Sequence, residues 1–159
     1  MKKFSFILIS IYFIILGCDK NHYIHSSHIE INGFWLKNNA IKANVEIRES
    51  PVDIYLVLKL NEDYPFSNIH LLSKLYNNDV KIIDTISYNF DDSKNRTILS
   101  KQIRIKTFKI PIFSNMNVKG EALIEVTHAV RFIDSIKPDI KLEGILDVGI
   151  FINKSNEKI

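Results

Sequence analysis

Three histidines near the N-terminus have a regular spacing that could bind a metal ion. His22, His25 and His28 lie three residues apart, and imidazole is the commonest side-chain metal ligand. Residues at i, i+3 and i+6 drift around a helix, however, and no carboxylate at a suitable spacing completes a tetrahedral set. We therefore interpret them as solvated histidines of a polar segment, and we expect no metal site and no cofactor.

A second set of oxygen-bearing side chains resembles the beginning of a calcium-binding loop. Asp91, Ser93 and Asn95 occupy alternate positions. An EF-hand loop also requires Gly at its sixth position and Glu at its twelfth, and this sequence has Arg96 and Gln102 there. The segment is better interpreted as a surface turn.

Motifs of nucleophilic and nucleotide-dependent enzymes are missing from the sequence. It contains no Gly-x-Ser-x-Gly elbow and no dinucleotide or Walker loop. His128 lies where the surrounding alternation calls for an apolar residue, and a buried imidazole needs hydrogen-bond partners. It is therefore either a core histidine with satisfied hydrogen bonds, which we favour, or the mark of a polar pocket. Together these features predict a protein that is not an enzyme.

The single cysteine, Cys18, follows a short apolar run. Two N-terminal lysines precede an apolar stretch that ends at Leu16, which is the layout of a secretory signal and is shorter than the roughly 20 residues of a membrane-spanning helix. The sequence Ile15 to Cys18 resembles the bacterial lipobox, in which the cysteine sulfur receives a diacylglyceryl group. We predict that residues 1–17 are a lipoprotein signal peptide and that Cys18 carries the lipid. The alternative is an uncleaved anchor.

Charge and localisation follow from this leader. Without Lys2 and Lys3, the 21 Lys and Arg residues fall to 19 against 18 Asp and Glu. The basic residues are scattered, whereas a nucleic-acid surface needs a concentrated patch. We expect lipid attachment to the cell membrane or outer membrane, on the periplasmic side, and no nucleic-acid partner.

The remaining sequence alternates apolar and polar residues with a period of two, which is typical of strands with one buried face. Turn-forming residues separate about eight such runs, a pattern that predicts an all-β, antiparallel β-sandwich of jelly-roll or immunoglobulin-like type. The clearest runs are Ile41 to Ile47, Ile54 to Leu60, Ala122 to Val126 and Leu146 to Ile152.

Domain boundaries can be placed on the same basis. Residues 18–28 are polar and without a sustained pattern, so we predict a flexible lipidated tether, followed by a single sandwich domain over residues 29–159. The sequence HAVRFIDSIK, residues 128–137, fits either a short amphipathic helix or a continued strand to Phe132 followed by a turn that ends at Pro138. We favour the strand.

The most distinctive internal stretch is NEDYPFSN, residues 61–68, between two expected strands. A hairpin loop here would present two aromatic rings, which are good anchors for a partner or a sugar ring. Alternatively, both rings fold back over the end of the sandwich. The candidate partner- or ligand-binding residues are Tyr64, Pro65, Phe66, Ser67 and Asn68.

Five segments, taken with the lipobox, form a recognisable combination. They are Trp35, Asp53-Ile54-Tyr55, YPFSNIHLL (residues 64–72), Asp84-Thr85 and LEGILDVGIFI (residues 142–152). The combination resembles the GldH family of gliding-motility lipoproteins from Bacteroidetes, and YPFSN and GILDVG are its specific parts. The chain departs from the family over residues 88–101, where the usual glycines and tryptophans are missing.

The resemblance implies a non-enzymatic accessory lipoprotein of the cell envelope that supports gliding in motile relatives. Its partners would be the membrane, through the lipid, and other envelope or gliding-machinery proteins. Bacteroidetes also attach O-glycans at Asp-Ser/Thr followed by an apolar residue, which marks Thr85 and Ser135 as candidate glycosylation sites. The alternative function, by fold-level analogy, is a lipid-anchored glycan-binding sandwich.

Replacing Cys18 with Ala should block acylation and leave an unprocessed precursor, because the thiol is the atom that receives the lipid. On a gel, the variant should be larger than the wild-type protein by the mass of residues 1–17. An Asp19→Ala variant is the matched control and should be processed normally. A Cys18→Ala band of normal mature size would contradict the lipoprotein interpretation.

Overall fold

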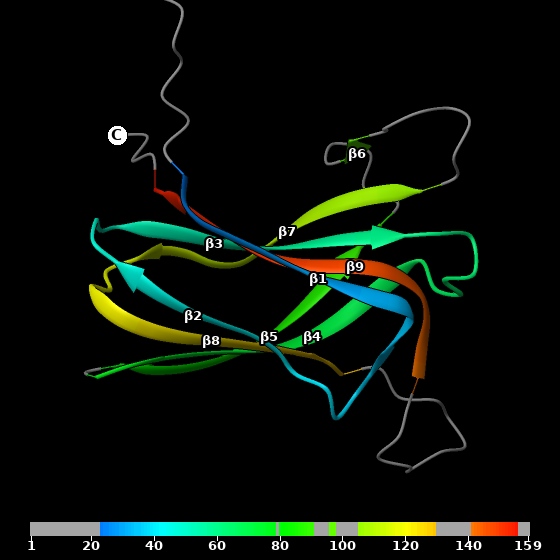
Figure 1. Ribbon diagram of the computed structural model, residues 1–159, viewed down its shortest axis with the longest axis horizontal. Coiled ribbons are helices and arrows are strands. Elements are labelled where there is room, and N and C mark those ends of the chain that lie inside the picture. Colours follow the sequence, from blue (N-terminus) through cyan, green and yellow to red (C-terminus); the bar gives the residue numbers. More distant parts are fainter. Residues whose placement is uncertain (1–22, 79, 91–95, 98–104, 130–140, 156–159) are drawn as a thin grey trace, which may run out of the picture.

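The computed structural model describes residues 23–78, 80–90, 96–97, 105–129 and 141–155, which form an all-β sandwich. The described residues contain nine strands in two antiparallel sheets that face each other (Figure 1). The predicted sandwich is therefore confirmed, and the predicted signal helix lies outside the described residues. The strands are β1 (Tyr23–Leu36), β2 (Ile41–Ile47), β3 (Val52–Leu60), β4 (Asn68–Asn77), β5 (Lys81–Asn89), β6 (Arg96–Thr97), β7 (Lys106–Met116), β8 (Gly120–His128) and β9 (Lys141–Lys154).

Strand pairing follows the pattern of one long hairpin that has rolled up. β1 pairs with β9, β2 with β8, β3 with β7 and β4 with β5, and successive pairs belong to alternate sheets. Pairing of β3 with β9, of β6 with β7 and of β4 with β8 completes the five-stranded sheet β1-β9-β3-β7-β6 and the four-stranded sheet β2-β8-β4-β5. This topology is that of a jelly roll, so the immunoglobulin-like alternative is wrong.

The core lies between the sheets and is formed by the apolar face of each alternating strand. Strand β2 buries every second residue, from Ile41 to Ile47, and β3 does the same from Val52 to Leu60. Ala122, Ile124 and Val126 of β8, which lies beside β2 in the same sheet, are buried as well. Because side chains alternate between the two faces of a strand, the sequence pattern correctly identified which side of these strands is buried.

Strand β9 departs from simple alternation at Leu146, which we expected to be buried. Lys59 pairs with Asp147, whereas the next residue, Leu60, pairs with Ile145, so Leu146 is an extra residue in a β-bulge. A bulge moves the following residues to the opposite face. Ile145 is therefore fully buried and Leu146 only half-buried.

Strand β1 corrects the predicted boundary of the tether. Tyr23 pairs with Asn153 and His28 with Gly149, so residues 23–28, which we assigned to the tether, belong to the sheet. The edge position explains the error, because the backbone of a polar segment can pair with a strongly apolar neighbour such as β9 without burying its own side chains. Only residues 18–22 of the expected tether lie outside the described strands.

Trp35 and His128 join the two sheets where β1 turns into β2. The Trp35 indole is fully buried and donates a hydrogen bond from Nε1 to the Asn39 carbonyl at 2.7 Å. His128 on β8 is 1% exposed, and its Nε2 lies 3.1 Å from the Trp35 carbonyl oxygen, so Nε2–H is the donor. The two rings meet edge to face at 5.3 Å. The favoured prediction that His128 belongs to the core is confirmed, and its Nε2 makes a structural hydrogen bond.

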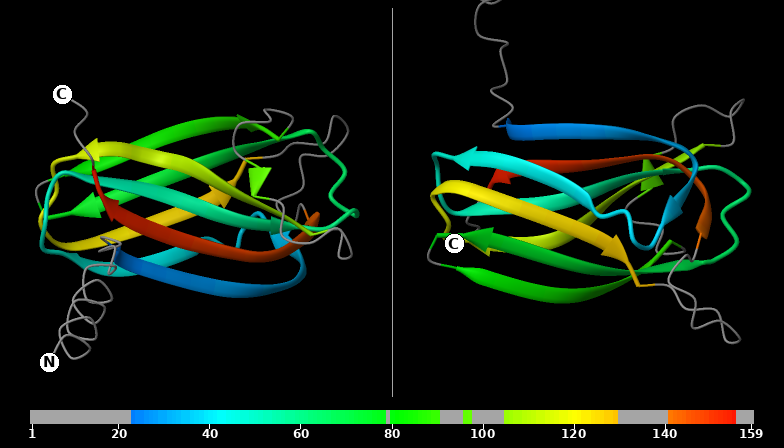
Figure 2. Two further views of the ribbon diagram at one scale, coloured as in Figure 1. Left: turned by 90° about the horizontal axis from the view of Figure 1, so that it is seen from above. Right: turned by 60° about the horizontal axis from the view of Figure 1, so that its bottom comes forward.

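The connections gather at two ends of the sandwich (Figures 1 and 2). At the proximal end, β1 begins, β9 ends, and the β2–β3, β4–β5 and β7–β8 turns lie together. At the distal end, the chain passes from β1 to β2 and from β3 to β4. The β3–β4 connection, residues 61–67, joins strands of different sheets. A hairpin joins neighbouring strands of one sheet, so the prediction of a hairpin loop here is wrong. Both lateral neighbours of β3 are already β7 and β9.

The β3–β4 connection lies directly against the backbone of Gly144 on β9. Asn61 donates its N–H to the Gly144 carbonyl at 2.9 Å. Gly144 has φ +80°, and a Cβ built on it would collide with the backbone of Asp63 and Tyr64. Glycine is required here for two reasons, since an L side chain would be strained at this φ and would displace the connection.

Gly144→Ala should lower the free energy of unfolding by more than about 3 kcal/mol, from a left-handed backbone cost of about 1–2 kcal/mol plus the collision. Gly120→Ala is the matched control, because Gly120 has φ +87° but open space around it. It should lose only about 1–2 kcal/mol. Urea unfolding measures both values, and equal losses would show that the contact with the connection is unimportant.

Candidate functional site

The two aromatic rings of the β3–β4 connection turn inward. The Tyr64 hydroxyl donates to the Asn68 carbonyl at 2.8 Å, and its ring meets those of Phe66 and Phe90 edge to face at 6.0 and 5.4 Å. Burial raises the pKa of Tyr64 well above its ordinary value. Of the two alternatives for these rings, folding back over the end of the sandwich is correct.

Tyr64 and Phe66 belong to an aromatic cluster that closes the distal end. Tyr88 and Phe90 reach it from β5 and the residue after it, and Phe108 reaches it from β7, with 4.5 Å between the Phe90 and Phe108 rings. The Phe90 N–H also donates to the Ser67 carbonyl at 2.8 Å. The cluster contains residues from both sheets, so the candidate loop has a structural role that its sequence did not reveal.

The exposed surface of the β3–β4 connection, which a partner could contact, is therefore mainly polar. Pro65, Ser67 and Asn68 are exposed, together with Asp63, whose N–H and carboxylate are both held by the Asn61 side chain at 3.1 and 2.7 Å. Such a local hydrogen-bonded turn limits the motion of the loop. The distal end thus presents a well-defined polar edge rather than an aromatic platform.

The GILDVG segment connects three strands of the five-stranded sheet. Asp147 on β9 accepts a hydrogen bond from Lys59 on β3 at 2.6 Å and lies 3.4 Å from Nδ1 of His28 on β1. A Cβ on Gly149 would come within 2.7 Å of His28 Nδ1 and the Ser27 carbonyl oxygen. The absence of a side chain at Gly144 therefore leaves room for the β3–β4 connection, and its absence at Gly149 leaves room for β1. His28, from the predicted solvated set, is exposed and also contacts the Asp147 carboxylate, and His22 lies outside the described residues.

The predicted modification sites have different positions relative to the described chain. Thr85 is exposed on β5, an edge strand of the four-stranded sheet, and its N–H donates to the Asp84 carboxylate at 2.7 Å. Its position is accessible, and its glycosylation stays a prediction. Cys18 and Ser135 lie outside the described residues.

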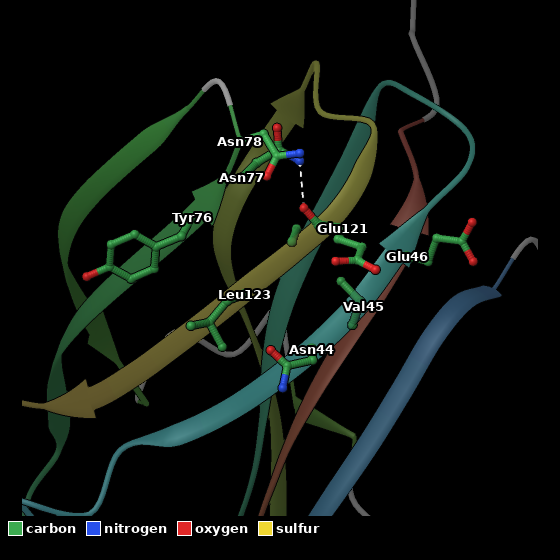
Figure 3. Close-up of a pocket in the computed structure, with 9 residues that line it drawn as sticks. Asn44, Val45, Glu46, Tyr76, Asn77, Asn78, Glu121 and Leu123 are labelled. Carbon is green, nitrogen blue, oxygen red and sulfur yellow. Dashed lines mark hydrogen bonds between the residues drawn. The ribbon is translucent and has the colours of Figure 1, made fainter.

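A hollow of about 550 Å³ on the outer face of the four-stranded sheet was not predicted from the sequence (Figure 3). Asn44, Leu123 and Tyr76 form one row across β2, β8 and β4, because Leu123 pairs with both of the others. Glu121 and Asn78 lie at the proximal side of this row. No sequence signal could identify the row, because it depends on which strands are neighbours.

Beside the hollow, Glu125 of β8 lies between two lysines. Lys42 on β2 is 2.8 Å away and Lys74 on β4 is 3.8 Å away. The Lys42 hydrogen bond lowers the pKa of Glu125 and holds the carboxylate ionised. This cross-strand ion group covers the centre of the outer face with polar atoms.

Two kinds of site are missing from the part of the chain that the structure describes. No three His, Cys, Asp or Glu side chains in it are grouped so as to hold a metal ion. Nor does it contain a helix long and apolar enough to span a bilayer.

These observations define a class, a jelly-roll domain with a polar surface and with its two most distinctive segments, YPFSN and GILDVG, in contact at one end. Within that class, the chain belongs to the GldH lipoprotein family, whose model matches residues 21–152. The resemblance inferred from the sequence is confirmed.

Two relatives align with the chain over nearly their whole length. The gliding motility lipoprotein GldH of Flavobacterium johnsoniae is 24% identical over 157 residues, which cover 97% of this chain and 98% of the relative. A protein of Christiangramia forsetii named as a homolog of that lipoprotein is 25% identical over 163 residues, covering 98% and 99%. No solved structure matches the chain significantly.

Proposed function

We propose that this chain is a lipid-anchored envelope protein that acts as a non-enzymatic accessory or assembly component of the gliding-motility machinery. The observation that carries the proposal is membership in the GldH lipoprotein family over residues 21–152, with full-length relatives named as gliding motility lipoproteins. The lipobox at Ile15 to Cys18 supports lipid attachment. Partner binding would use the polar surface of the jelly roll.

The structure supports an assembly role through the rigidity of its ends. At the distal end, the connection is held by Gly144 and by the aromatic cluster. At the proximal end, Ser50 donates from Oγ to Asn117 Oδ1 at 2.9 Å, and Asn77 donates from Nδ2 to the Lys119 carbonyl at 3.0 Å. A surface whose loops are fixed before binding loses little conformational entropy when it binds.

Deletion of the gene in its own host should abolish or strongly reduce colony spreading, and expression of the wild-type chain should restore it. A Cys18→Ala chain at equal abundance should not restore spreading, because it would lack the anchor. Affinity purification of the Cys18-anchored protein should recover other envelope proteins. Normal spreading of the deletion strain, with no partner recovered, would overturn the proposed function.

A second candidate function is glycan binding, favoured by the hollow over β2, β8 and β4. It combines the Tyr76 ring and the Leu123 side chain with amide and carboxylate groups, and sugar sites use such an aromatic face with polar partners. The Tyr64 and Phe66 rings, which first suggested this function, are unsuitable because they pack inward.

Tyr76→Ala should weaken binding of envelope polysaccharide by at least about twofold if this second function is real, since contacts to an aromatic ring contribute about 0.5–1.5 kcal/mol beyond area burial. Calorimetry with host polysaccharide measures the effect. Tyr55→Ala, on the outer face of the opposite sheet, is the control and should leave affinity unchanged. If the wild-type chain takes up no polysaccharide, glycan binding is excluded and the assembly role is unaffected.

A further inference from the structure

We propose that the jelly roll stands end-on at the bilayer, with its proximal end against the lipid headgroups and its distal end directed away from them. The occupant of the proximal end is therefore a lipid surface, and the partner-accessible surface is the distal end. The inference rests on lipid attachment at Cys18, which is part of the proposed function.

The first argument is the short distance between the expected lipid and the folded domain. β1 begins at Tyr23, five residues after Cys18. A fully extended chain spans at most about 3.5 Å per residue, so the Cα of Tyr23 lies within about 18 Å of the Cα of Cys18. Strand β3 has nine residues, so at about 3.3 Å per residue the distal end lies about 30 Å beyond the proximal end.

The second argument is that β1 is attached to the sheet from its first residue. Its pairing with β9 begins at Tyr23 opposite Asn153 and continues to Leu36 opposite Lys141. Further along, His28 contacts Asp147 and lies over Gly149. The domain therefore cannot lengthen its connection to the lipid by releasing the start of β1 without losing sheet pairing.

The third argument is the chemistry of the proximal end. Its turns are joined to one another by the Ser50–Asn117 and Asn77–Lys119 hydrogen bonds, and Lys154 pairs with Glu49 at 3.2 Å. Cations and carboxylates balance among the described residues of this end, and Ile83, which is exposed, lies two residues after Lys81 on β5. Because the short link to the lipid would hold this end at the membrane, it needs no basic or apolar surface of its own, and a charge-balanced end can rest on headgroups without entering the acyl layer. The charged residues are Arg48, Lys81, Lys119 and Lys154, with Glu46, Glu49, Asp53 and Glu121.

The fourth argument is that neither broad face is suited to lie flat on a membrane, which would require a basic or apolar surface. The outer face of the four-stranded sheet carries the Lys42–Glu125–Lys74 group. On the other sheet, Lys109 covers the Tyr55 and Phe151 rings at 4.0 and 4.4 Å. The large hydrophobic residues that are exposed in the described chain, Ile29 and Ile83, lie on different sheets.

The test uses the full, processed and lipidated chain in phosphatidylcholine vesicles that carry an acceptor fluorophore on a small fraction of headgroups. Cys18 is the only cysteine and its sulfur would be acylated, so an introduced cysteine can be labelled uniquely with a donor. Lys119→Cys places the donor at the proximal end, and Pro65→Cys and Asn38→Cys place it at the distal end. All three positions are exposed.

Energy transfer to the headgroups should be at least about twofold more efficient from Lys119→Cys than from either distal position, because those lie about 30 Å further away. Inserting a flexible segment of about 20 Gly and Ser residues after Lys20 should remove the difference. Equal transfer from both ends, or stronger transfer from the distal end, would overturn the inference. Mass spectrometry of Cys18 separates failure of the end-on inference from failure of the lipid anchor. An unacylated chain that does not bind vesicles would contradict the lipid anchor, whereas an acylated chain with equal transfer from both ends would contradict the end-on orientation.

Discussion

The close approach of the β3–β4 connection to Gly144 is the constraint on which the distal end depends. At this point two backbone segments touch where a Cβ would not fit, and the Asn61–Gly144 hydrogen bond fixes their separation. The connection can then cross from the five-stranded to the four-stranded sheet with Tyr64 directed onto Phe90. Because the aromatic cluster fills the space between the sheets, moving this contact would open the core to water at that end.

The same strand organises the other contacts of the five-stranded sheet. From Gly144 to Gly149, β9 contains a bulge, a carboxylate that pairs with Lys59, and a glycine that leaves room for His28. These features give a physical reason for the two segments on which the resemblance to the GldH lipoprotein family was chiefly based. YPFSN and GILDVG are far apart in sequence and form opposite sides of one contact, which makes a structural role sufficient to explain both.

In the proposed arrangement, the distal end contacts partners and the proximal end contacts the membrane. The distal end carries the fixed polar edge around Pro65 and Ser67, whereas the proximal end carries the turns and the start of β1. A short link to the lipid would keep the distal end at a fixed height above the membrane and the proximal end next to the membrane. An assembly component benefits from such an arrangement, because partners anchored in the same membrane meet it in a restricted orientation.

The sequence by itself determined strands β2, β3 and β8 and their buried faces, because a period of two directly reflects the geometry of an extended chain. Only the tertiary structure decided the order of the strands, and several errors follow from that. The polar segment before Ile29 proved to be an edge strand because β9 lies beside it, and Leu146 left the core because of a bulge in the pairing with β3. Likewise, Tyr64 and Phe66 turned inward because Gly144 allows the connection to approach, and Asn44, Leu123 and Tyr76 came together because β8 lies between β2 and β4. In each case the deciding contact joins residues distant in sequence, and local periodicity carries no information about such a contact.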